Sequence, residues 1–214
     1  ISIITTGDEI SSKFSDPTEG IIRDSNRPYL ESTVQQSGCI LDSSYSVKDN
    51  QVELIKSIKE ASKTSDIIVT TGGVSAGHMD FIPEALIEMG AKILFHKVSI
   101  RPGKPILFAT LKDGTLIFGL PGNPIAVAVG WCFFVKEAIR IMLGKENDSS
   151  IAGKLINDTE SRSGLRFFAK ALSTVNENGE TIVEILPGQQ SFKISPLMRA
   201  NCWAIFPEGD TNTR

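Results

Sequence analysis

The sequence has no long apolar run, no cysteine pair and no excess of basic residues. A membrane-spanning helix needs about 18 or more apolar residues in succession, and the N-terminal residues also lack a signal-peptide pattern. The cysteines, Cys39, Cys132 and Cys202, form no C-x-x-C motif, which argues against structural zinc and suits reduced thiols in a cytoplasm. A net charge of -3 leaves no basic face for a polyanion. We therefore expect a cytoplasmic protein with no membrane and no nucleic-acid partner.

What the chain does have is the composition of a globular protein. It contains 214 residues, of which 41% are hydrophobic and 22% are charged. This length is enough for one large domain or two small ones. The chain begins at Ile1, inside the strand-like run "ISIITT", without an initiator methionine. We expect it to be a fragment of a longer protein.

The sequence divides into two regions with different patterns. As far as Gly144, apolar runs alternate with helical-period segments, a pattern typical of a mainly parallel α/β sheet. After a polar linker at 145–150, strand and turn signals predominate, including a hairpin around "NENG". We therefore predict an α/β domain over 1–146 and an all-β domain over 147–214. Strands are expected at 1–6, 40–47, 66–71, 91–98, 105–111, 116–120, 166–175, 180–186 and 201–207, and helices at 26–38, 50–63, 81–90 and 123–144.

A glycine-rich stretch, "TTGGVSAGHMD" (Thr70–Asp80), follows one of the apolar strands. Ligands of parallel sheets bind beyond the carboxyl ends of the strands, where a glycine turn exposes N–H groups to an anion. The stretch matches neither a P-loop nor G-x-G-x-x-G. Its closing acid, Asp80, is therefore a candidate for holding Mg²⁺ on a substrate phosphate. The alternative, about equally weighted, is that Asp80 caps the helix that follows.

Other strand ends also carry acids. Gly7, Asp8 and Glu9 follow the first expected strand, and Asp49 follows the second. Together with Asp80 they predict an acidic site at one edge of the sheet. The alternatives are a turn or N-cap role for Asp49 and a solvated turn for Glu9.

Basic residues gather in a different turn, "HKVSIRPGKP". It holds Lys97, Arg101 and Lys104 beside Pro102 and Pro105, a combination that suits an oxyanion. The alternative is a solvated hairpin with surface charge.

The segment "GLPGNP" opens the long apolar helix. Pro121 and Pro124 fix a tight turn there, and Asn123 is placed to cap the helix. On its own this is an ordinary strand-to-helix turn, so its meaning depends on the neighbouring motifs.

Taken in order, "TTGDEI", "IIRDSNRPYL", "TTGGVSAGHMDF", "KVSIRPGKP", "FGLPGNP" and "PGQQSFKISPLMRANCWAIFPEG" resemble the molybdopterin molybdenumtransferases, the MoeA and gephyrin E-domain family. The resemblance implies a three-layer αβα sandwich of the MogA-like molybdopterin-binding fold, followed by a small β-barrel. It also implies insertion of molybdate into adenylylated molybdopterin with release of AMP, assisted by Mg²⁺. The expected partners are a second copy of the chain in a homodimer, the adenylyltransferase and acceptor molybdoenzymes.

The resemblance also implies roles for individual residues. The barrel segment departs from the family pattern at "GLRFFAK", where Arg166 is the expected basic contact and Arg162 its rival. The implied catalytic residues are Asp80, Asp49 and Glu9, with Asp80 and Glu9 as metal ligands. Those implied for the pterin and the AMP phosphate are Thr71, Gly72, Gly73, Ser75, Gly77, Pro121, Asn123 and Pro124. Those implied for molybdate are Lys97, Arg101, Lys104, Pro105, Arg166 and Ser191.

Two other functions stay open. A molybdopterin adenylyltransferase shares the α/β fold, but it usually reads GGTG where this chain reads "GGVSAG", and it lacks the LPGNP turn and the barrel. A gephyrin-like scaffold would use the same region to bind a partner without catalysis.

Overall fold

The computed structural model describes residues 1–11, 21–74, 81–146, 149–157 and 164–208. The chain forms two compact units. The first unit comprises Ile1–Val98 and Pro105–Gly122, and the second comprises Ser99–Lys104 and Asn123–Arg214. The second unit thus includes the long helical segment that precedes residue 147. The domains 1–146 and 147–214 stay a prediction.

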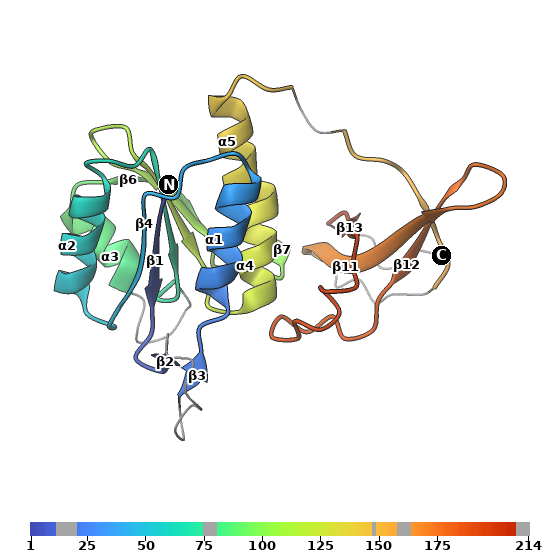
Figure 1. Cartoon of the computed structure of the whole chain (residues 1–214), viewed down its shortest axis with the longest axis horizontal. Helices are drawn as coiled ribbons and strands as arrows, with labels where there is room; N and C mark the ends of the chain where they lie inside the picture. Colours follow the sequence, from blue (N-terminus) through green and yellow to red (C-terminus); the bar gives the residue numbers. More distant parts are fainter. Residues whose placement is uncertain (12–20, 75–80, 147–148, 158–163, 209–214) are drawn as a thin grey trace. The chain divides into compact units, whose positions relative to one another are not determined.

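The first unit is built on a mainly parallel sheet, as predicted (Figure 1). Its strands lie in the order β4 (Ser43–Val47), β1 (Ser2–Thr6), β5 (Ile67–Thr71), β9 (Leu116–Leu120), β8 (Leu107–Thr110) and β6 (Lys92–His96). The pairs β4–β1, β1–β5 and β5–β9 are parallel, whereas β8 runs antiparallel to both of its neighbours. A small parallel pair, β2 (Ile10–Ser11) with β3 (Ile22–Arg23), extends from β1.

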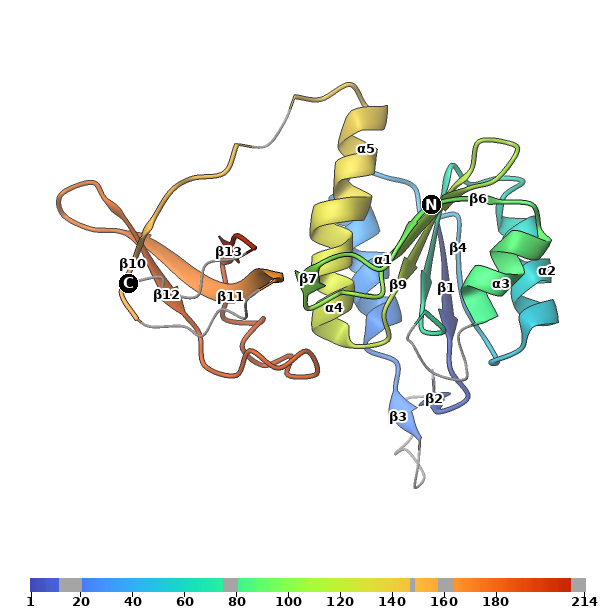
Figure 2. The ribbon, with the colours of Figure 1, turned by 180° about the vertical axis from the view of Figure 1, so that it is seen from behind.

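Helices cover both faces of this sheet. The helix α1 (Asn26–Gln36) lies on one face, and α2 (Gln51–Ala61) and α3 (Phe81–Glu88) lie on the other (Figure 1; Figure 2). Leu54 and Ile58 of α2 pack with Ile4, Ile68 and other apolar side chains in a buried core, as expected for an i, i+4 apolar stripe.

The buried face of α2 differs from the predicted one. The helical period of "NQVELIKSIKEASK" predicts Val52, Ile55 and Ile58 on one side, but Val52 is 75% exposed. Leu54, Ile58 and Ala61 are the buried residues, because their i, i+4, i+7 spacing forms a stripe that Val52 does not join.

The helix starts also correct one prediction. The sequence "NRPYLESTVQQSG" predicts Asn26 as the cap of α1, but the Asp24 carboxylate accepts the backbone N–H groups of Asn26 and Arg27 instead, at 3.1 and 2.9 Å. At α2, Asn50 is the N-cap, and its side chain accepts N–H bonds from Val52 and Glu53. The cap of α2 is therefore supplied by the residue next to Asp49.

The second unit begins with a continuous helical run. It consists of α4 (Pro124–Gly130), the π-helical turn η1 (Trp131–Val135) and α5 (Lys136–Met142). The sequence predicted a single helix here and gave no sign of the π turn. Asn123 stands at the N-cap position as expected, although its side chain makes no capping hydrogen bond.

The rest of the second unit is β-structure. Its sheet has the order β10 (Lys154–Leu155), β12 (Thr181–Ile185), β11 (Arg166–Val175) and β13 (Cys202–Phe206), and β7 (Ile100–Arg101) pairs with β11. The β11–β12 hairpin turns at "NENG", as predicted, where the Asn176 side chain accepts the N–H groups of Asn178 and Glu180. Phe133 of η1 lies against Phe168 of β11, with ring centroids 4.3 Å apart.

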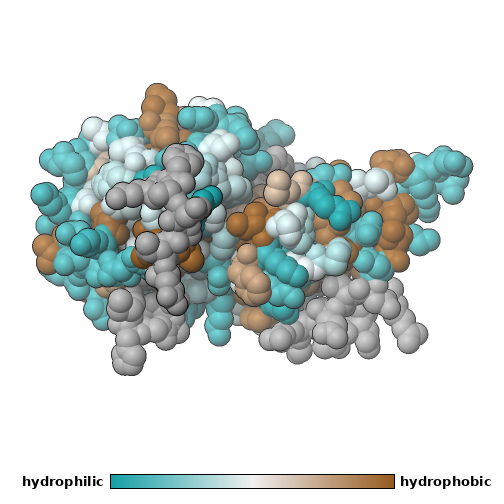
Figure 3. Space-filling model, turned by 60° about the horizontal axis from the view of Figure 1, so that its bottom comes forward, coloured by the Kyte–Doolittle hydropathy of each residue, from teal (hydrophilic) through white to brown (hydrophobic). Residues whose placement is uncertain are grey.

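The surface mixes polar and apolar groups. The face seen in Figure 3 carries many hydrophilic residues with apolar ones between them. Across the described ranges, we find no helix that is both long enough and apolar enough to cross a membrane.

Candidate functional site

The candidate site lies at the carboxyl edge of the parallel strands in the first unit. Thr6 of β1 pairs with Val47 of β4, and Thr71 of β5 pairs with both Thr5 and Leu120. The strands therefore end at nearly the same level. Their following turns meet at one edge, as the parallel arrangement requires.

Acidic residues from two of these turns lie side by side. The backbone N–H of Asp8 donates to the Asp49 carboxylate, and the N–H of Asp49 donates to the Asp8 carboxylate, each at 3.3 Å. Partial burial raises the pKa of Asp49, and the negative charges of Glu9 and Asp8 raise it further, against the lowering effect of the Asp8 N–H. The edge thus holds negative charge that repels itself and would favour a cation.

The glycine turn after β5 approaches β1 too closely for any side chain. Gly72 has φ +92°, and a Cβ there would lie 2.6 Å from the Thr6 hydroxyl and closer still to the Thr6 carbonyl oxygen. Gly73 also has a positive φ, +60°. Glycine is therefore required at Gly72 by space as well as by backbone angle. The predicted residues Ser75, Gly77 and Asp80 lie outside the described residues.

Asn26 links the turns that follow β5 and β9. Its Nδ2 donates to the Gly122 carbonyl at 2.8 Å and to the Thr71 hydroxyl at 3.1 Å, and that hydroxyl donates to the Pro121 carbonyl at 3.2 Å. Because the Gly122 carbonyl can only accept, the amide orientation is determined. Its Oδ1 is buried and has no hydrogen-bond partner among the described residues.

Asn26 was missed as a site residue by reasoning from the sequence. The stretch "IIRDSNRPYL" supplied the only signal, and a cap was the simplest reading of an Asn at a helix start.

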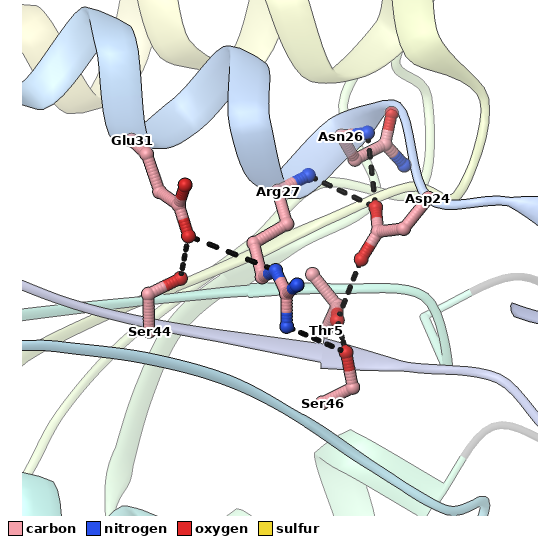
Figure 4. A network of polar contacts seen from close by, with 7 residues as sticks. All are labelled: Thr5, Asp24, Asn26, Arg27, Glu31, Ser44 and Ser46. Carbon is pink, nitrogen blue, oxygen red and sulfur yellow. Dashed lines mark hydrogen bonds and ion pairs between the residues drawn. The ribbon is translucent and has the colours of Figure 1, made fainter. Parts of the chain in front are cut away.

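A polar network fixes the start of α1 against β1 and β4 (Figure 4). The Thr5 hydroxyl donates to Asp24 at 3.0 Å, and the Arg27 guanidinium donates to the Ser46 hydroxyl at 3.4 Å. Arg27 also forms an ion pair with Glu31 at 3.6 Å. This network holds Asn26 at the edge, because its backbone N–H is one of the groups bound by Asp24.

Most of the basic candidates belong to the second unit. Strand β7 pairs with β11 so that Ile100 lies opposite Arg166, and the Arg166 N–H donates to the Ser99 carbonyl at 2.9 Å. The Arg101 guanidinium stacks over the Phe167 ring, 5.3 Å from its centroid. The structure therefore brings Arg101 and Arg166 onto neighbouring strands, although they are distant in the sequence.

The remaining basic candidates divide between the units. Lys104 is exposed in the second unit, whereas Lys97 and Pro105 belong to the first unit. Lys97 adopts φ +68°, an uncommon angle for a residue with a side chain. Arg162, the rival of Arg166, lies outside the described residues.

Ser191 is joined to the turn that opens α4. Its carbonyl accepts the Ile125 N–H at 3.0 Å, one residue beyond Pro124. Ser191 is half-buried, in a loop between β12 and β13. The second unit thus contains Arg101, Lys104, Asn123, Pro124, Arg166 and Ser191.

The described residues contain no group of three or more His, Cys, Asp or Glu side chains arranged to hold a metal ion. The predicted metal ligand Asp80 is outside the part of the chain that was searched. Within it, Glu9 and Asp49 supply oxygen donors, the kind that Mg²⁺ prefers.

A mainly parallel sheet with a glycine turn and acids at its carboxyl edge defines an α/β protein of the class whose ligands commonly bind at that edge. Residues 2–141 match the model of the probable molybdopterin binding domain, and the chain belongs to this family. The predicted family resemblance is therefore confirmed.

Relatives of known name match nearly the whole chain. A molybdopterin molybdenumtransferase of Staphylococcus aureus is 32% identical over 213 residues, covering 98% of this chain and 50% of the relative. One of Bacillus subtilis is 34% identical over 212 residues, covering 98% and 49%. The crystal structure of a molybdopterin biosynthesis MoeA protein from Pyrococcus horikoshii superposes with a TM-score of 0.77 at 25% identity, covering 100% of this chain and 50% of that one. The chain spans about half the length of these relatives.

Proposed function

We propose that this chain is the pterin-binding and C-terminal part of a molybdopterin molybdenumtransferase. Adenylylated molybdopterin and molybdate bind, AMP leaves, and the metal remains on the pterin dithiolene. The observation that carries the proposal is the acidic edge beside a glycine turn, in a chain whose named relatives match over 98% of its length. The carboxylates of this edge would suit a cation, and the rest of the glycine turn would offer N–H groups to an anion, since the Gly72 N–H itself donates to the Leu120 carbonyl at 3.2 Å.

Mg²⁺ would suit the carboxylate oxygens that Glu9 and Asp49 bring to this edge. The pKa of Asp49 is raised first by its partial burial and then by the neighbouring carboxylates of Glu9 and Asp8, whose repulsion a cation would relieve. Glu9 and Asp80 would hold the ion, with Asp49 beside it. Bound there, Mg²⁺ would act as a Lewis acid toward the phosphoanhydride.

The protein residues divide the remaining tasks. The residues proposed to bind the pterin and the AMP phosphate are Thr71, Gly72, Gly73, Ser75, Gly77, Pro121, Asn123 and Pro124. Basic and hydroxyl donors receive molybdate, a tetrahedral dianion. These are Lys97, Arg101, Lys104, Arg166 and Ser191, with Pro105 shaping the turn.

The proposal extends to the assembly. The strands of the second unit would close into a small β-barrel, and a homodimer in the cytoplasm would complete each cleft with the neighbouring copy. The adenylyltransferase that makes the substrate and the molybdoenzymes that accept the product are the proposed transient partners.

The experiment that tests the function is AMP release from adenylylated molybdopterin by the intact protein. We expect AMP release to require molybdate, and we expect the same concentration of sulfate not to replace it. Molybdate-independent ATP consumption would favour the adenylyltransferase alternative. Binding of neither nucleotide nor pterin would favour a scaffold and would refute the proposal.

Asp80→Asn separates a metal ligand from a helix cap. We expect it to nearly abolish AMP release while leaving the thermal midpoint almost unchanged. Asn50→Ala, which removes the observed cap of α2, is the reference for cap loss and should cost about 1 kcal/mol of stability. Because Asn caps a helix about as well as Asp, an Asp80→Asn variant with normal turnover, together with an Asp80→Ala midpoint lowered like that of Asn50→Ala, would identify Asp80 as a cap only.

A further inference from the structure

A lysine is completely buried in the second unit. Lys170 lies on β11 and is 0% exposed. Its backbone is held by Gln189, whose Oε1 accepts the Lys170 N–H at 2.9 Å and whose Nε2 donates to the Lys170 carbonyl at 2.9 Å. Leu186 donates to the same carbonyl at 3.0 Å. The loop that follows β12 is thus fastened to β11 directly beside this lysine.

The Lys170 ammonium is surrounded by backbone carbonyls of that loop. Its Nζ donates to Gly188 at 2.8 Å, to Lys193 at 3.1 Å and to Gln190 at 3.3 Å. An ammonium has three N–H donors, so these bonds use its full capacity. The carbonyls point inward from an irregular segment, and no β-ladder is formed between Gly188 and Lys193 to satisfy them.

Keeping a charge at this position is unfavourable in itself. Burial lowers the pKa of Lys170 to about 8, and the positive charge of Lys193 adds to the effect. An apolar side chain of similar size would avoid that cost, as it often does for buried charges. It would leave the loop carbonyls without donors, however. The lysine is therefore explained by the conformation of the loop rather than by the stability of the unit.

Ser191 is in the middle of this loop. Its carbonyl is held by the Ile125 N–H at the start of α4, while the carbonyls of Gln190 before it and of Lys193, two residues after it, are held by Lys170. The loop backbone is thus fixed from α4 and from β11 at once. These contacts fix the backbone from which the Ser191 side chain projects.

We infer that Lys170 is a positioning residue that holds the Gly188–Lys193 loop so that Ser191 can bind the oxyanion substrate. The inference rests on the proposed function, which makes molybdate that oxyanion. Lys170 itself does not contact the anion, because its donors are all used by the loop carbonyls.

The test compares Lys170→Met, which keeps the length of the side chain without its donors, with Lys170→Arg, which keeps charge and donors. Lys154→Met, at an exposed lysine of β10, is the matched control. Hydrogen exchange of the intact protein without ligands reports on the loop, and the molybdate dependence of AMP release reports on the substrate.

In Lys170→Met, we expect the amides of 188–193 and Ile125 to exchange roughly tenfold faster or more, with β1 and β5 unchanged. The molybdate concentration for half-maximal AMP release should rise by roughly tenfold, with the maximal rate nearly unchanged. Lys170→Arg should behave more like the wild type than like Lys170→Met, and Lys154→Met should match the wild type. If Lys170→Met does not fold, Lys170→Gln, which retains an amide donor, takes its place.

Unchanged exchange in the loop would overturn the inference. So would a loosened loop with an unchanged molybdate dependence, although the insertion activity would then stand. AMP release by the wild-type protein that does not depend on molybdate would refute the proposed function and the ligand named here. This would hold even if the loop of Lys170→Met exchanges faster as expected.

Discussion

Gly72→Ala tests whether the glycine turn is constrained by space or only by its backbone angle. The positive φ costs an alanine about 1–2 kcal/mol wherever it occurs. At Gly72 the added Cβ also overlaps Thr6, which is buried and paired with Val47, so β1 must shift to make room. Overpacking of this kind costs about 1–3 kcal/mol. We therefore expect Gly72→Ala to lower the free energy of unfolding by about 2–5 kcal/mol.

Gly114→Ala is the matched control. Gly114 has φ +93°, against +92° at Gly72, but a Cβ there would meet nothing within 4 Å. It should therefore show only the backbone cost, about 1–2 kcal/mol. Equal losses in the two variants would refute the steric argument.

The assay is urea denaturation at 25 °C, followed by circular dichroism and by tryptophan fluorescence. Trp131 and Trp203, the 2 tryptophans of the chain, both belong to the second unit. Fluorescence therefore reports on the second unit, whereas circular dichroism reports on both. If Gly72→Ala lowers the urea midpoint measured by circular dichroism more than the midpoint measured by fluorescence, the loss of stability lies in the first unit.

Three further variants test the rest of the site. Folding raises the pKa of Asp49 above the ordinary value of 3.8, so ionisation of this carboxyl lowers the stability of the protein as the pH rises above 3.8. Asp49→Asn should therefore raise the thermal midpoint at pH 7, and this gain should disappear as the pH is lowered toward 3.8. A gain that persists at low pH would contradict this account. Asn26→Asp removes the donors to Gly122 and should lower the free energy of unfolding by about 1–3 kcal/mol in urea, whereas a loss below about 0.5 kcal/mol would mean that the link is dispensable. Lys104→Met should raise the molybdate concentration needed for AMP release by roughly tenfold, and Lys112→Met, an exposed control, should not; equal effects would indicate a general charge effect.

The strand ends of the first unit could be predicted because their signals are local. Apolar runs gave the strands, the alternation with helices gave the parallel order, and parallel order alone brings the turns at Glu9 and Asp49 to one edge. The cap of α2 was ambiguous, since Asp49 and Asn50 both suit an N-cap. The structure assigns that role to Asn50.

The features that sequence reasoning missed depend on contacts between distant segments. Asn26 reaches Gly122 across the sheet edge, and β7 finds its partner in β11. A lysine in an apolar strand pattern, as at Lys170, looks like a solvated edge position until the loop carbonyls around it are known. The π turn at Trp131–Val135 has no compositional signature of its own.

The path of the chain between its two units affects how the protein can be divided. Residues 99–104 belong to the second unit, 105–122 return to the first, and the chain then re-enters the second at Asn123. Truncation after residue 146 would therefore not release a self-contained half. It would remove β11, the strand that pairs with β7, and Phe168, whose ring packs against that of Phe133. It would also leave the Ile125 N–H without the Ser191 carbonyl. A fragment meant to contain the whole second unit would instead have to carry residues 99–104 as well as 123–214.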